Sequence, residues 1–189
     1  MRRLCLRFFM GEILMETPFV LSEYWQYSVA VAQIISAIAV VGAVVMAIKT
    51  LRSNADTAKK SLTATFLFES KHDYGFWDGH KVIREIHESS RSFRDLIYND
   101  NLSEDDVVKR RQIHYFLNFF ERVSVSVKND IYDECMLKQV FYSSAVKNFD
   151  IIEPFIKALR EKYNTNTYYQ EYQWLARKWA ASPLIVDHS

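Results

Sequence analysis

Apolar and polar positions divide this chain into one long uncharged segment and a series of shorter amphipathic ones. Residues 27–48 read YSVAVAQIISAIAVVGAVVMAI and contain no charged side chain. At 1.5 Å rise per residue, such a helix is roughly 33 Å long, enough to cross the hydrocarbon core of a bilayer. A buried core helix is seldom this long without a charge, and a signal peptide has a shorter apolar region close to a basic start. The pattern therefore predicts a transmembrane helix over residues 27–48.

The helical pattern continues beyond this segment but becomes amphipathic. From Ile48 onward, apolar or small side chains recur at 3–4–3–4–3 spacing, and we call the five that follow Ile48 the stalk seam: Leu51, Ala55, Ala58, Leu62 and Thr65. The seam is shorter than the three to four heptads of a secure coiled coil. We expect a juxtamembrane helical stalk over residues 49–66 whose seam packs against the protein's own domain.

Residues 67–181 have the pattern of a helical domain. Gly75 and Gly79 indicate a break between two helices within residues 66–98. Ser103, with an acidic residue three positions later, is a favourable N-cap for a helix over residues 104–128. That helix is apolar nearly all round, as expected of the central helix of a bundle.

The remaining residues predict further helices. Asp133 is an acceptable N-cap for a helix to about Asn148, and Pro154 either kinks this helix or begins another. A last helix over residues 168–180 has an apolar face that ends before Pro183. The fold class predicted is all-α: one transmembrane helix that continues into a cytosolic bundle of five or six helices.

Charge near the uncharged segment predicts its orientation. Basic residues follow it closely: Lys49, Arg52, Lys59 and Lys60. The positive-inside rule places this side in the cytoplasm and the N-terminus outside, and the basic flank suits anionic lipid headgroups. Three arginines at the start of the chain oppose this orientation but lie at the edge of the window that counts. The lead of residues 1–26 is predicted to be disordered or partly spurious, since Met10 and Met15 are alternative starts, and residues 182–189 form a flexible tail.

Three segments carry a resemblance to a known family. YFLNFFERVSVSVKNDIYDE, FIKALREKYNT and YYQEYQWLARKW resemble the bacterial and prophage domain-of-unknown-function family numbered 4760. The shared pattern consists of Leu117, Asn118, Phe120 and Glu121, with Arg160 and the aromatic-rich last helix. The resemblance implies a small protein with one N-terminal span and a helical cytosolic domain. It implies a bacterial inner (plasma) membrane and a prophage-related or defence role, but no known activity.

Asn118 and Glu121 are three residues apart on the most apolar helix and therefore lie on nearly one face. A buried carboxylate costs several kcal/mol unless it is paired. We expect a structural buried polar network of Asn118, Glu121 and Arg160, because no nucleophile, Gly-rich loop or second acid accompanies the pair. The alternative is a catalytic or ligand-binding acid.

Histidines offer only a weak metal signal. His80 and His87 share a helix face two turns apart, but the i, i+4 spacing of a helical metal site is missing. We therefore expect no metal, no cofactor and no enzymatic activity. The alternative is a membrane-tethered enzyme or metal-dependent effector that uses Glu121, His80 and His87.

The partners expected are the lipid bilayer and an unidentified protein. Lys and Arg number 24 against 23 Asp and Glu, a net charge of +1, and the basic run Lys109-Arg110-Arg111 has no aromatic stacking platform, so we expect no nucleic acid. Small residues line one face of the predicted span, and this face is a candidate for homo-oligomerisation: Ala32, Ser36, Ala39, Ala43 and Ala47. The leading interpretation is a helical protein-interaction or regulatory domain on a single-pass anchor.

Overall fold

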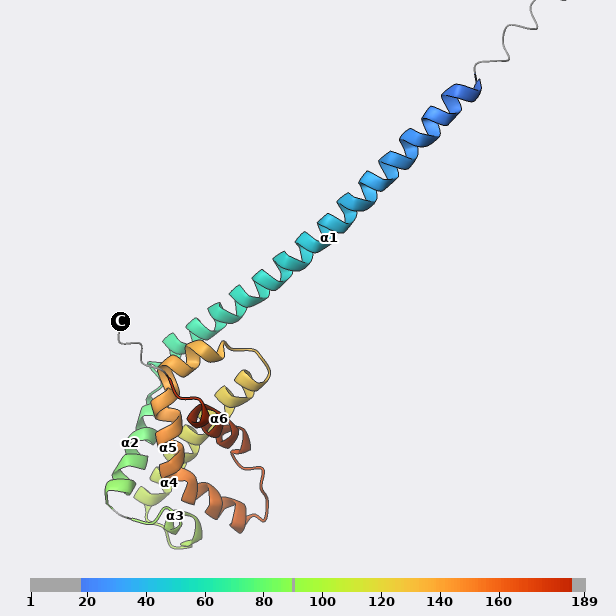
Figure 1. The fold of residues 1–189 in the computed structure, drawn as a ribbon. Helices are drawn as coiled ribbons and strands as arrows, with labels where there is room; N and C mark the ends of the chain where they lie inside the picture. Colours follow the sequence, from blue (N-terminus) through green and yellow to red (C-terminus); the bar gives the residue numbers. More distant parts are fainter. Residues whose placement is uncertain (1–17, 90, 185–189) are drawn as a thin grey trace, which may run out of the picture. The chain divides into compact units, whose positions relative to one another are not determined.

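The computed structural model describes residues 18–89 and 91–184, and every regular element in them is a helix (Figure 1). In chain order the helices are α1 (Pro18–Ser70), α2 (Tyr74–Glu88), α3 (Asp95–Tyr98), α4 (Glu104–Lys128), α5 (Glu134–Lys162) and α6 (Gln170–Ala181). The all-α class and the five helices that follow the apolar one are therefore confirmed. The chain forms two compact units, one up to Asn54 and the other from Ala55.

The first unit consists of the N-terminal part of α1. This helix is long and apolar enough to span a membrane, and its side chains from residue 23 to residue 58 are all exposed. The predicted lead of residues 1–26 was wrong over residues 18–26, which are helical, and residues 1–17 lie outside the described residues. Pro18 begins α1, since its fixed φ and missing N–H suit the first helical position.

The second unit includes the last turns of α1, and a different face from the one predicted packs against the domain. All five residues of the stalk seam are exposed, so the expectation that the seam packs on the domain was wrong. The packed face includes Lys59, Thr63, Phe66 and Ser70, which have the same 4–3–4 spacing displaced by one position, and Leu67 packs beside them. The reason is the size of Phe66, whose ring lies 5.0 Å from that of Tyr132 and 5.6 Å from that of Phe119.

Two glycines that were predicted to end a helix instead lie inside α2. A Cβ atom on Gly79 would come within 2.5 Å of the backbone carbonyl oxygen of Gln112 and 2.7 Å of the Phe116 Cβ, both on α4. A Cβ atom on Gly75 would meet only the Tyr115 ring, at 2.7 Å. The glycines therefore permit the close approach of α2 and α4. The predicted break between two helices is present, but it lies at residues 71–73 and not at the glycines.

Helix α4 has the bounds predicted for it, and it is the centre of the domain core. Ser103 caps its first turn by accepting the Asp106 N–H at 3.2 Å, and the alternating Val123–Val127 segment is helical. The core contains Phe116, Phe120 and the side chains of α5 and α6 that pack against them. Helix α5 runs through Pro154 without interruption, and Asp133 caps it as predicted by accepting the Met136 N–H at 2.9 Å.

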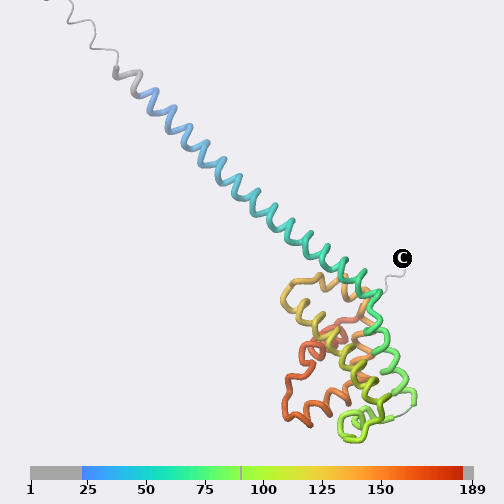
Figure 2. Tube along the Cα trace, turned by 180° about the vertical axis from the view of Figure 1, so that it is seen from behind, coloured from blue at the N-terminus to red at the C-terminus, as the bar shows by residue number. Residues whose placement is uncertain are grey.

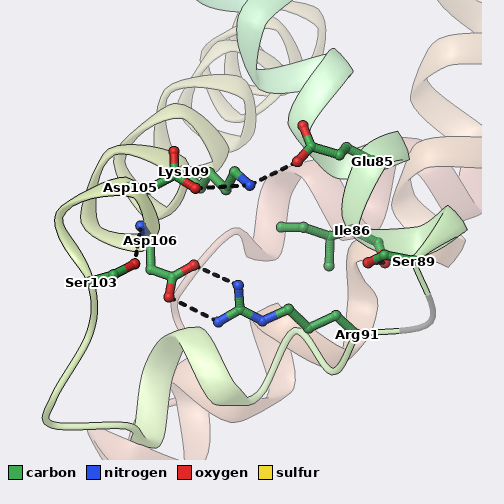
Figure 3. Close-up of polar contacts among 8 residues, drawn as sticks. All are labelled: Glu85, Ile86, Ser89, Arg91, Ser103, Asp105, Asp106 and Lys109. Atoms are coloured by element: carbon green, nitrogen blue, oxygen red, sulfur yellow. Dashed lines mark hydrogen bonds and ion pairs between the residues drawn. The ribbon is translucent and has the colours of Figure 1, made fainter.

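Ion pairs join the C-terminal half of α2 and the segment after it to the first turns of α4 (Figure 3). Arg91 donates to both carboxylate oxygens of Asp106, at 2.5 and 3.0 Å. Lys109 lies 2.7 Å from Glu85 and 3.0 Å from Asp105. The Arg91 guanidinium lowers the pKa of Asp106 from 3.8 to about 2. These contacts fix the loop between α2 and α4.

Candidate functional site

Glu121 caps the N-terminus of α6. Its Oε2 accepts the Tyr172 N–H at 2.8 Å and its Oε1 accepts the Glu171 N–H at 3.3 Å. The residue at the N-cap position, Tyr169, has a left-handed backbone with φ 54° and provides no side-chain cap. Glu121 therefore provides, from α4, the acceptor that a serine or aspartate normally provides within the helix.

The other two residues of the predicted polar network have different surroundings. Arg160 donates from Nε and Nη2 to the Tyr168 carbonyl oxygen, at 2.9 and 2.7 Å, and from Nη1 to Gln173 at 2.7 Å. It thus holds the turn before α6, while Glu121 holds the first turn of α6. Asn118 is exposed on α4, so its predicted place in a buried network was wrong. Positions three residues apart differ by about 60° around a helix axis, and this difference places Asn118 at the surface while Glu121 is partly buried.

Burial raises the pKa of Glu121, and the two backbone N–H bonds only partly offset this effect. Burial also lowers the pKa of Arg160. Both ionised groups therefore lose hydration in the fold, as expected of charged side chains that hydrogen-bond to the backbone of a packed turn.

The histidines of the alternative enzyme interpretation lie elsewhere. His80 and His87 line a pocket of about 360 Å³ between α2 and α5, whose lining does not include Glu121. Burial, followed by the charge of Arg84, lowers the pKa of His80. Among the described residues, no group of three or more His, Cys, Asp or Glu side chains is placed to hold a metal ion. The fold thus does not assemble Glu121, His80 and His87 into one centre.

A second pocket, adjoining this one, is apolar, and we call it the apolar groove. It has a volume of about 510 Å³ and lies between the end of α1, the start of α2 and the first half of α5. Its large apolar side chains are Leu67, Phe68, Phe76, Trp77, Met136, Val140 and Phe141. Phe68 is 75% exposed, Val140 58% and Trp77 51%, so much of their surface is in contact with solvent.

The apolar groove and the histidine pocket share Ser144 and follow the same two helices. Lys71 lies at the apolar end, and Arg84 and Lys147 lie at the other. Glu88 is the one carboxylate in the two linings, and it pairs with Arg84 at 3.2 Å. The apolar groove and the histidine pocket together therefore form one surface that is mostly apolar at one end and basic at the other.

The family comparison covers this whole region. The family described as Domain of unknown function (DUF4760) matches residues 36–179. This chain belongs to that family. No curated protein and no solved structure matches it.

The DUF4760 pattern quoted from the sequence has a mostly structural explanation. Leu117 and Phe120 are fully buried, and the Phe120 ring stacks on Tyr172 with centroids 4.8 Å apart. Glu121 caps α6, whereas Asn118 contributes to the surface. The groove was not predicted from the sequence, since Phe68 lies outside the stalk seam and Trp77 lies on a different helix, α2.

Of the four basic residues that follow the span, two form ion pairs and two are exposed. Lys59 pairs with Asp130, which raises its pKa through their hydrogen bond, and Lys60 pairs with Asp56 at 2.8 Å. Lys49 and Arg52 are exposed. Lys59 therefore serves the contact between α1 and the loop before α5.

The small-residue face of the span is exposed, and it consists of Ala32, Ser36, Ala39, Ala43 and Ala47. Every other face of α1 in that part of the chain is exposed too. Self-assembly through this face remains a prediction.

Proposed function

We propose that this DUF4760 protein is a single-pass membrane protein whose helical domain binds another protein through the apolar groove. The observation that carries the proposal is the exposure of Phe68, Trp77 and Val140 around one cavity. Monomeric soluble domains seldom expose large apolar side chains side by side, and aromatic anchors in a pocket are typical of binding hot spots.

The partner segment that fits best is an amphipathic helix with acidic residues toward both ends. From Met136 to Ile151 the two pockets follow about 22 Å of α5, at 1.5 Å per residue, which corresponds to four turns of a docked helix. Apolar side chains spaced at i, i+3 and i+7 would enter the groove near Trp77. Acidic side chains of the partner would lie near Lys147 and Lys71, whose charges no acidic residue of the two linings offsets, because Glu88 pairs with Arg84.

The proposal places the domain in the cytoplasm and the start of the chain outside. Support comes from the uncharged helix and the basic residues Lys49 and Arg52 that follow it. The bacterial inner membrane and a prophage-related or defence role belong to the same proposal, as does a role in binding without catalysis. They are suggested by the DUF4760 family, whose match covers residues 36–179.

A photocrosslinking experiment on the full chain in intact membranes tests the groove. A photoreactive amino acid replaces Phe68 in one variant and Val108, which is 45% exposed on α4 and lines no described pocket, in the control. We expect a discrete protein adduct at position 68 that Val140→Asp removes, and none at position 108. Equal adducts at both positions, or an adduct that persists with Val140→Asp, would show that the groove is not the binding surface.

Thiol labelling tests the orientation. Cys135 is exposed at the start of α5, where a reagent can reach it. In a Cys5→Ser variant, a membrane-impermeant maleimide should label Cys135 only after the cells are opened. Labelling of Cys135 in intact cells would place the domain outside.

A further inference from the structure

A third pocket, away from the apolar groove, is lined by basic side chains. It has a volume of about 390 Å³ and lies where α3, the first half of α4 and the end of α5 meet. In both views α3 is at the end of the domain remote from residues 55–70 (Figures 1 and 2). Its polar lining consists of Arg110, Arg111, His114, Lys162 and Tyr163, and the rest is apolar.

The positive charges of this pocket are not balanced by nearby acids. The lining contains three permanent cations, Arg110, Arg111 and Lys162, and no carboxylate. None of the ion pairs found among the described residues involves any of the three. Like charges brought together around a cavity repel one another, and an anion in the cavity would relieve this repulsion.

Two of the cations are held in place by the backbone of α3. The Lys162 Nζ donates to the Ile97 carbonyl oxygen at 2.6 Å, and the Arg110 Nη1 lies 3.5 Å from the adjacent Leu96 carbonyl oxygen. Each contact uses one donor, whereas a guanidinium has five N–H groups and an ammonium has three. Both side chains therefore keep donors for a ligand while their positions are fixed.

The basic run Lys109-Arg110-Arg111 is divided by the fold. Lys109 forms ion pairs with Glu85 and Asp105, so it does not extend the basic surface (Figure 3). The two arginines lie instead with Lys162, from α5, which is 51 residues further along the chain than Arg111. A compact pocket of this kind suits a small anion better than an extended polyanion.

We propose that the basic pocket binds the phosphate group of a small organic phosphate. A phosphate carries about 1.5 to 2 negative charges and three acceptor oxygens, which matches three cations better than a single carboxylate does. Arginine binds phosphate with two parallel hydrogen bonds, and lysine binds it as a point charge. The volume and the apolar walls leave room for an organic group attached to the phosphate. The same chemistry is offered by a soluble phosphate ester and by a phospholipid headgroup.

Calorimetric titration of the full chain in non-ionic detergent tests the proposal, with inorganic pyrophosphate as the probe and ionic strength held constant with sodium chloride. We expect saturable binding with one site per chain. The double variant Arg110→Gln, Arg111→Gln should weaken it roughly tenfold or more, because charge-assisted hydrogen bonds are lost. The control double variant Lys81→Gln, Arg177→Gln removes the same charge from exposed positions on α2 and α6 and should bind like the wild type.

Absence of saturable binding in the wild type would overturn the proposal, and so would equal weakening in both double variants. An unchanged thermal unfolding midpoint in the Arg110, Arg111 variant shows that lost binding is not lost folding. If that variant does not fold, Lys162→Gln, on the exposed end of α5, replaces it. The result is independent of the apolar groove, which shares no residue with this pocket.

Lipid discs then distinguish the two sources of phosphate. If a headgroup is the ligand, discs that contain phosphatidylglycerol should compete with pyrophosphate, and the difference between wild type and the Arg110, Arg111 variant should vanish. If a soluble ester is the ligand, the same difference should appear in discs of phosphatidylcholine with and without phosphatidylglycerol. Either outcome supports a phosphate site in this pocket.

Discussion

Replacement of Glu121 separates a structural cap from a catalytic acid. Glu121→Ala removes both acceptors at the start of α6 and leaves the N–H groups of Glu171 and Tyr172 without them. Loss of an N-cap costs about 0.5–2 kcal/mol, and a buried unsatisfied donor costs about 1–3 kcal/mol. We therefore expect Glu121→Ala to lower the free energy of unfolding by roughly 2–3 kcal/mol.

Glu121→Gln is the matched variant, because it keeps one acceptor oxygen and removes the charge. The pKa of Glu121 is raised by burial, so the folded state holds its proton more tightly than the unfolded state does. The contribution of the carboxyl group to stability is then greatest below its unfolded pKa and declines as pH rises through its folded pKa. At pH 7 Glu121→Gln should be destabilised less than Glu121→Ala, because it keeps one acceptor and removes the buried charge. Its difference in stability from the wild type should grow as the pH falls toward 4, since the wild type gains stability when Glu121 is protonated.

Urea unfolding of the full chain in mild detergent, followed by tryptophan fluorescence, measures these differences. Trp179 is fully buried on α6, so its emission reports the docking of the capped helix. If Glu121→Ala unfolded at the same urea concentration as the wild type and lost only an activity or a bound metal, the capping role would be refuted. Equal destabilisation by Ala and Gln would show that the charge itself is required.

Two further predictions concern the contact between α2 and α4. Gly79→Ala should destabilise the domain by about 1–3 kcal/mol in the same assay, since the new methyl group would meet the Gln112 carbonyl. Gly75→Ala should cost less, because the half-exposed Tyr115 ring can move. Equal destabilisation by the two variants would contradict this prediction. The pKa of Asp106 falls from 3.8 to about 2, so its ion pair with Arg91 should contribute at most about 2 kcal/mol above pH 4, and this is lost as pH falls through 2. Asp106→Asn should therefore be less stable than the wild type at pH 7. The same difference in the free energy of unfolding at pH 2 would contradict the prediction.

Several features of the fold followed from local sequence alone. The uncharged run at 27–48 predicts a long apolar helix because helix length and side-chain polarity are properties of neighbouring residues. Ser103 and Asp133 mark the starts of α4 and α5, because an N-cap side chain bonds to a backbone N–H only three residues away. Periodicity also predicted an apolar face on the last helix, and Trp179 on that helix is fully buried.

Interactions between distant segments account for what the sequence pattern misjudged. A glycine has the same local signature whether it ends a helix or admits a neighbouring one, and only the packing of α4 against Gly79 distinguishes the two. Likewise, the stalk seam and the packed face that includes Thr63 have the same heptad spacing. The face that packs is the one that places Phe66 among the aromatic rings of α4 and α5.

Local sequence pattern predicted one long apolar helix followed by a helical domain, and it pointed to Glu121 and Arg160 as residues with a structural role. The groups that these charges bind depend on tertiary packing, because Glu171, in the first turn of α6, lies 50 residues from Glu121 in the chain. Tertiary packing also decided the composition of both proposed sites. The apolar groove and the basic pocket each combine residues from helices far apart in sequence, and no periodicity within one helix records which side chains of another it will meet.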